Sequence, residues 1–173
     1  ECDDRCLGTG MTADDDDDGD GILDDDDDYP LDPENNVFTY TVEENIAMIT
    51  GCAKTCPVNL EIPETINSYS VESIGEFAFS GSTTIVNLVI PDHIKTIGRA
   101  AFSNTSSLES VVVGNSLEII PYQAFYLSAV NSIIIGDSVT QISQNAFAST
   151  DNLVSVAFGN SEVSIGDYGF YDS

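Results

Sequence analysis

Apolar residues recur through residues 58–173 with a period of about 23 residues. The period is clearest at five phenylalanines, which are separated by 23, 23, 22 and 23 residues: Phe79, Phe102, Phe125, Phe147 and Phe170. An isoleucine precedes each phenylalanine by five residues, and a strand-like apolar pair, such as Val111 with Val113, follows most of them. A fixed period of this length is the signature of stacked structural repeats. The pattern therefore predicts a mainly β solenoid with parallel strand ladders.

Each unit ends its strand at a proline or glycine, at Pro63, Pro91, Gly114, Gly136 and Gly159. One unit alone buries too little apolar surface to be stable, so adjacent units must share apolar layers. The first unit carries five extra residues between Pro63 and Ile74, and we expect them to form a bulging loop.

The consensus of one unit is L-x-x-V-x-I-P-x-x-V-x-x-I-G-x-x-A-F, and on this basis residues 58–173 resemble the BspA-like leucine-rich repeat, also called the Treponema pallidum type. The resemblance implies a leucine-rich-repeat solenoid of about five units, the last incomplete, and a role in extracellular attachment. The small cysteine column of that family is filled here by Ser82, Thr105 and Thr150, so a buried row of thiols is not expected.

Residues 37–57 precede the repeats and follow a different pattern. The runs VFTYTV and IAMIT, joined by Glu43-Glu44-Asn45, predict a β-hairpin over residues 37–50. We expect this hairpin to cap the first repeat, because the end of a solenoid exposes apolar core and an open strand edge. At the other end the sequence stops in mid-unit just after Phe170. We expect that end to be covered, either by missing repeats or by another subunit.

The first 36 residues differ from the repeats in their high density of negative charge. The formal net charge is −26, which excludes nucleic acid as a partner. Eleven of the fifteen residues from Asp14 to Asp28 are aspartate. Because neighbouring carboxylates repel one another, so many can converge only around a cation.

The spacing within this acidic run matches the oxygen ligands of an EF-hand-type calcium loop, with Gly21 at the sharp bend. The predicted Ca²⁺ ligands are Asp16, Asp18, Asp20, the backbone carbonyl of Ile22, Asp24 and Asp27. Tyr29, Pro30 and Pro33 follow, so no helix leaves the loop as it would in an EF-hand. A solvated acidic linker is the alternative, and Mg²⁺ fits less well because it retains more water.

The string DDDGDGILDDDDDYPLDP resembles the thrombospondin type 3 repeat, with Tyr29 where that family usually has cysteine. The resemblance implies two calcium ions, and four further carboxylates are available to a second ion: Asp14, Asp25, Asp28 and Asp32. We therefore assign residues 14–36 to a calcium-binding repeat and residues 1–13 to an N-terminal linker that contains cysteines.

Four cysteines occur as two pairs with the same spacing, Cys2 with Cys6 and Cys52 with Cys56. Disulfides and a four-thiolate zinc site are both compatible with this spacing. Three disulfide pairings are possible, and we favour the two local ones. Disulfides and a calcium site both indicate an oxidising compartment. Because the sequence starts at Glu1 without a signal peptide, we expect a processed secreted protein or a fragment, located outside the cell or on a bacterial cell surface.

The sequence offers no recognisable catalytic centre. The only histidine, His93, follows Asp92 in a turn, where a solvated loop residue is expected, and no nucleophile motif serves it. Glu61 and Glu64 form a possible carboxylate pair, but exposed acids are common in so acidic a chain. No apolar stretch approaches the roughly 20 residues that a membrane span needs. We predict a non-enzyme that does not span a membrane.

The remaining candidate chemistry is on the surface of the repeats. Residues that alternate with the core positions of each strand form an outward apolar column: Val89, Val112, Ile134 and Ala157. Beside it runs a small polar column of Asn87, Ser110, Ser132 and Ser155, and a separate aromatic rim is formed by Tyr122, Tyr126, Tyr168 and Tyr171. The apolar column is either a docking face for a protein or glycan ligand or a simple preference of strands for β-branched residues.

Two functions follow from these features. The first is a calcium-binding adhesion or protein-interaction module in which the acidic segment is a stiff stalk. The second is a structural subunit that assembles end to end with copies of itself into calcium-stabilised filaments.

Overall fold

The computed structural model describes residues 37–173, which contain strands and turns and no helix. Phe38–Ser173 form one compact unit. None of these residues belongs to a helix that could cross a membrane. The linker, the predicted calcium ligands, Cys2 and Cys6 all lie outside the described residues.

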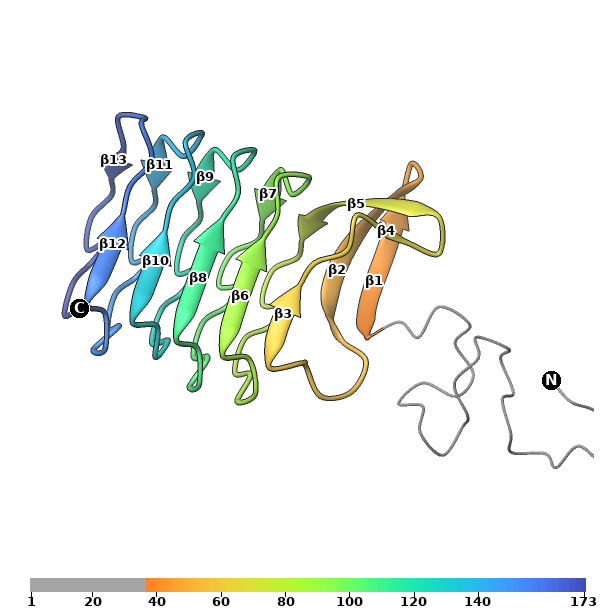
Figure 1. Ribbon diagram of the computed structural model, residues 1–173, viewed down its shortest axis with the longest axis horizontal. Coiled ribbons are helices and arrows are strands. Elements are labelled where there is room, and N and C mark those ends of the chain that lie inside the picture. The colour runs from red at the N-terminus through yellow and green to blue at the C-terminus, as the bar shows by residue number, and fades with distance from the viewer. Residues whose placement is uncertain (1–36) are drawn as a thin grey trace, which may run out of the picture. The chain divides into compact units, whose positions relative to one another are not determined.

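Two parallel ladders run along this unit, as predicted (Figure 1). The longer sheet has the order β12-β10-β8-β6-β3, and its strands in chain order are Asn59–Glu61 (β3), Asn87–Ile90 (β6), Ser110–Val113 (β8), Ser132–Ile134 (β10) and Ser155–Ala157 (β12). The shorter sheet, β13-β11-β9, consists of Ile119–Ile120 (β9), Gln141–Ile142 (β11) and Ser164–Ile165 (β13). The structure thus confirms a mainly β solenoid of stacked parallel strands.

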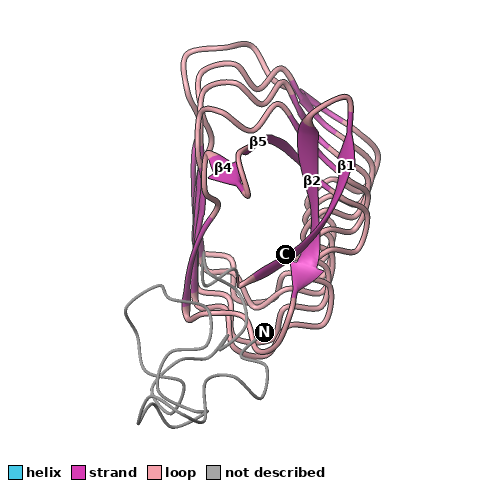
Figure 2. Cartoon of the chain, turned by 90° about the vertical axis from the view of Figure 1, so that its right-hand side faces the viewer, coloured by secondary structure: helices cyan, strands magenta, loops and turns pink. Residues whose placement is uncertain are grey.

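A third sheet closes the N-terminal side of the repeats. Phe38–Glu43 (β1) and Ile46–Cys52 (β2) form an antiparallel hairpin, and the positive φ angles of Glu44 and Asn45, 49° and 69°, belong to its two-residue turn. β2 also pairs in parallel with Tyr69–Ile74 (β5), which in turn pairs with Thr96–Ile97 (β7). Viewed from this end, β1 and β2 lie in front of the superposed repeats (Figure 2). The hairpin therefore adds one more strand, β2, to the parallel strands stacked on this side of the repeats.

The extra residues of the first unit form strand instead of the expected bulging loop. Thr65–Ile66 (β4) pairs antiparallel with the start of β5. The turn between them is made by Asn67 and Ser68, whose φ angles are 48° and 65°. A two-residue turn with two positive φ angles matches the twist of its strands, so the insertion folds back as a small hairpin.

The core is organised around the repeated phenylalanines. Phe79, Phe102, Phe125, Phe147 and Phe170 stack in series, with centroid distances of 5.2, 5.4, 5.1 and 5.0 Å. Phe38 of the hairpin closes the N-terminal end of this stack, edge-on to Phe79 at 6.3 Å. From the sequence alone, the strand of the following unit would be expected to cover each ring. The structure shows instead that the ring of the following unit does so, because equivalent turns lie directly above one another.

The turns that carry these rings are also tied together through the backbone. The residues two before and two after each phenylalanine have positive φ angles, as at Gln123 (57°) and Leu127 (57°). This conformation points N–H groups along the stack: Gln123, Phe125 and Leu127 donate to carbonyls of the next unit at 3.4, 2.8 and 3.1 Å. L-residues with positive φ angles are strained. In these turns the same conformation allows three backbone hydrogen bonds from each unit to the next.

The last described unit differs from the others in burial. Phe158 and Ile165 are 46% and 51% exposed, whereas Ile135 and Ile142, their equivalents in the preceding unit, are 2% and 0% exposed. Both side chains are uncovered because no described unit follows this one.

Candidate interaction surface

The outward apolar column forms a continuous row across the longer sheet. Strand pairing places Glu61 beside Val89, Val89 beside Val112, Val112 beside Ile134, and Ile134 beside Ala157. Glu61, Val89, Val112 and Ile134 point away from the core because the residues on either side of each are buried. Ala157 continues the row in register. Val89, Val112 and Ile134 are 37%, 39% and 54% exposed. We call Val89, Val112, Ile134 and Ala157 the apolar stripe.

A ladder of polar side chains borders the stripe where the strands begin. The Asn87 amide donates to Oδ1 of Asn59 at 2.8 Å, and the Ser110 hydroxyl donates to Oδ1 of Asn87 at 2.6 Å. Ser132 and Ser155 continue this column in register. These short side chains leave the apolar stripe accessible to a flat partner surface.

A second polar ladder borders the stripe beyond the ends of the strands. Asp92 accepts a hydrogen bond from the Asn115 backbone N–H at 2.6 Å, and Asn115 accepts one from the Asp137 N–H at 2.9 Å. Asp137 in turn accepts one from the Asn160 N–H at 2.9 Å. The stripe is thus an apolar strip between two polar rims, which is the composition of a protein interface core with its rim.

Residues considered for catalysis are not brought together in the described structure. Glu61 belongs to the same row as the stripe, whereas Glu64 lies in the turn before the β4–β5 hairpin. His93 is half-buried and its Nε2 is buried without a hydrogen-bond partner, which differs from the solvated side chain that we expected. Among residues 37–173, no three His, Cys, Asp or Glu side chains converge in a way that would hold a metal.

The local cysteine pairing is present at the one position that the structure describes. Cys52 and Cys56 form a disulfide. The Thr84 hydroxyl donates to the Cys56 carbonyl at 2.7 Å, and the Asn87 backbone N–H donates to the Val58 carbonyl at 3.0 Å. The disulfide loop is therefore fastened to the first repeat on the side of the phenylalanine turn.

One arrangement of side chains at the turns was not predicted from the sequence. The Arg99 guanidinium lies between the rings of Phe77 and Tyr122, at 5.5 and 5.3 Å from their centroids. Tyr168 and Tyr171, two members of the expected aromatic rim, are exposed and contact each other edge to face at 5.5 Å. The spacing of about 23 residues between Phe77, Arg99 and Tyr122 is the signal that could have revealed the stack.

Residues 53–173 match the family model of the BspA type leucine rich repeat region, in six copies. This is one copy more than the units counted from the phenylalanines. The chain therefore belongs to the BspA-type leucine-rich-repeat family. Comparison with curated proteins finds no match.

Solved structures with the same fold include the pneumococcal vaccine antigen PcpA, with a TM-score of 0.57, 21% identity, and coverage of 79% of this chain and 46% of that one. A leucine-rich repeat protein from Bacteroides ovatus ATCC 8483 has a TM-score of 0.52, 24% identity, and coverage of 79% and 49%. A leucine rich cell surface protein from Faecalibacterium prausnitzii A2-165 has a TM-score of 0.47, 20% identity, and coverage of 79% and 45%. The chain matches less than half the length of each of these proteins.

Proposed function

We propose that this chain is an extracellular or cell-surface adhesion module that binds a protein ligand through the apolar stripe. The observation that carries the proposal is a row of exposed apolar residues between two hydrogen-bonded polar ladders. Covering the stripe removes apolar surface from water while the ladders keep their internal hydrogen bonds. A protein ligand fits better than a glycan because the stripe offers aliphatic side chains and no polar group of its own.

The test replaces the most exposed member of the stripe. Ile134→Glu places a charge in the middle of the row without entering the core, since Ile134 is 54% exposed. Ile119→Glu is the matched control, because Ile119 is 45% exposed on β9 of the other sheet. Beads coated with each variant are tested for attachment to immobilised extracellular-matrix proteins and to cultured cells. We expect Ile134→Glu to weaken attachment at least about tenfold and Ile119→Glu to leave it unchanged; equal effects would exclude the stripe as the docking surface.

Calcium binding by the acidic segment is the second part of the proposal. Its support is the order of aspartate, glycine and isoleucine between Asp16 and Asp27, which matches a calcium loop. Bound Ca²⁺ would neutralise the repelling carboxylates and stiffen residues 14–36 into a stalk that spaces the repeats from whatever precedes them.

A calcium titration with four variants tests this part. Asp16→Ala, Asp20→Ala and Asp27→Ala remove predicted ligands and should weaken binding sharply. Asp26→Ala removes the same charge at a position that is not a predicted ligand and should matter less. Equal losses at all four positions would indicate a diffuse polyanion. A chelator should increase proteolysis of residues 14–34 and leave the circular dichroism of the repeats intact, since the two parts draw on different sources of stability.

End-to-end assembly is a second candidate function: in a chain that carries no repeat after Phe170, Phe158 and Ile165 stay exposed. The hairpin of another copy could cover these side chains, and a contact of this kind propagates into a filament. Sedimentation in calcium and in chelator is the test, with Phe170→Asp as the variant expected to abolish polymers and leave a folded monomer. A wild-type monomer under both conditions would exclude assembly and leave the adhesion module.

A further inference from the structure

Arg99 contacts aromatic rings from the units on either side of it. Its Cζ lies 5.5 Å from the centroid of Phe77 and 5.3 Å from that of Tyr122. The backbone keeps the three residues in line, because Phe77 N–H donates to the Arg99 carbonyl at 3.0 Å and Ala100 N–H donates to the Tyr122 carbonyl at 3.1 Å. The guanidinium carries five N–H donors along its edge, and these can bind a planar anion such as a carboxylate.

No carboxylate among the described residues uses that edge. The whole chain has 30 acidic residues and only four Lys and Arg. Lys95 shows the usual outcome in such a chain, since its Nζ pairs with Glu72 at 2.6 Å. Arg99 is exposed and forms no ion pair within residues 37–173. The rings already restrict its side chain, so a carboxylate that binds here pays little further conformational entropy.

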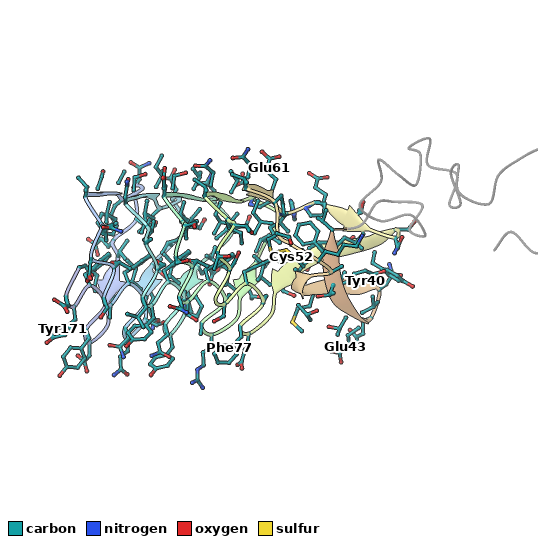
Figure 3. The ribbon with its side chains drawn as sticks, turned by 90° about the horizontal axis from the view of Figure 1, so that it is seen from below. Tyr40, Glu43, Cys52, Glu61, Phe77 and Tyr171 are labelled. Atoms are coloured by element: carbon teal, nitrogen blue, oxygen red, sulfur yellow. A yellow bond between two sulfur atoms is a disulfide. The ribbon has the colours of Figure 1, made fainter. Side chains whose placement is uncertain are left out.

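The two rings beside Arg99 provide apolar surface that lies away from the stripe. Phe77 is 48% exposed and Tyr122 is half-buried. In Figure 3, Phe77 and Tyr171 project from the lower edge of the molecule, whereas Glu61, which shares the row of the stripe, projects from the upper edge. An arginine between aromatic side chains has the composition of an interface hot spot. We call Phe77, Arg99 and Tyr122 the arginine ridge.

We infer that the arginine ridge is a second protein-binding surface, whose partner presents one Asp or Glu carboxylate to Arg99 beside an apolar side chain that covers Phe77. A carboxylate is the expected ligand because its charge complements that of Arg99. A polyanion is disfavoured because the chain itself is acidic: residues 100–173 carry seven acids and no Lys or Arg. A second copy is also disfavoured, because it carries the same net charge of −26. This surface is independent of the stripe, so either can fail without the other.

The test uses two libraries of short, blocked peptides that share an apolar residue and differ only in an adjacent Glu or Gln. Binding to the full chain is measured by fluorescence anisotropy at physiological salt. We expect binders in the Glu library, with their Gln counterparts at least about tenfold weaker. Arg99→Gln should abolish this difference. The matched control Lys95→Gln should preserve it, because Lys95 is already paired with Glu72.

One further variant and one further measurement separate the structural role of Arg99 from its binding role. Arg99→Lys keeps the charge but loses the planar fork, so it should bind the Glu peptides more weakly than wild type and still retain a preference over Gln. Far-UV circular dichroism of Arg99→Gln must match wild type for the comparison to count; otherwise Arg99→Lys alone decides. Equal binding of both libraries, no binding by either, or equal effects of Arg99→Gln and Lys95→Gln would overturn the inference. Preferential binding of a peptide of residues 14–28 would assign the ridge to a second copy and overturn it too, as would Arg99-dependent binding of an acidic oligosaccharide without peptide binding.

Discussion

Replacing Phe125 tests whether the stack of rings stabilises the solenoid. Phe125 is fully buried and contacts Phe102 at 5.4 Å on one face and Phe147 at 5.1 Å on the other. A buried Phe→Ala change costs about 3–5 kcal/mol in total, and each aromatic pair lost accounts for about 0.5–1.5 kcal/mol of such a cost. Because Phe125 loses two pairs, we expect Phe125→Ala to lower the free energy of unfolding by an amount at the upper end of this range, about 4–5 kcal/mol. This is a large share of the roughly 5–15 kcal/mol typical of a domain.

Two further variants separate stacking from simple burial. Phe170 is half-buried and stacks on Phe147 alone, at 5.0 Å, so Phe170→Ala should cost about half as much, roughly 2 kcal/mol. Phe125→Leu keeps most of the apolar volume and loses both aromatic pairs, so it should cost about 1–3 kcal/mol.

Urea unfolding followed by far-UV circular dichroism measures all three variants against wild type. The expected order of destabilisation is Phe125→Ala first, with Phe125→Leu and Phe170→Ala below it. If Phe170→Ala costs as much as Phe125→Ala, the number of stacked neighbours does not determine stability. If Phe125→Leu is as stable as wild type, the rings act only as apolar filling.

Four further substitutions and the reduction of one disulfide have outcomes that follow from local geometry. Gly136→Ala should destabilise the protein strongly, because a Cβ there would lie 2.2 Å from the Gly114 carbonyl oxygen. Gly81→Ala should cost only about 1–2 kcal/mol of left-handed backbone strain, since nothing lies within 4 Å of a Cβ at that position. Equal melting temperatures for the two variants would contradict this expectation. Thr105→Val should cost about 1–3 kcal/mol because it removes the buried hydrogen bond to the Phe102 carbonyl. In contrast, Ser128→Ala should be neutral or stabilising, since the buried Ser128 hydroxyl has no partner; calorimetry distinguishes the two. Reducing the Cys52–Cys56 disulfide, which closes a loop of sequence separation 4, should lower stability by up to about 2 kcal/mol without loss of strand signal.

The repeats, the hairpin and the stripe could all be predicted from the order of residues. Side chains alternate between the two faces of a strand, and a constant period places equivalent residues of successive units side by side. For this reason the outward positions Val89, Val112 and Ile134 had to fall in one row once their strands paired in register. The same reasoning identified the buried phenylalanines and isoleucines before any contact between them was known.

The tertiary structure alone determines which residues of neighbouring units contact one another. These contacts depend on how far each turn is offset from the next. The period shows that Phe102 and Phe125 are equivalent, but only the backbone hydrogen bonds between turns place their rings face to face at 5.4 Å. The same offset brings Arg99 between Phe77 and Tyr122, although these three residues occupy two different positions of the repeat. Sequence periodicity determines which residues share a column. The spacing and rotation between neighbouring units, set by packing and backbone pairing together, determine which residues of adjacent columns meet.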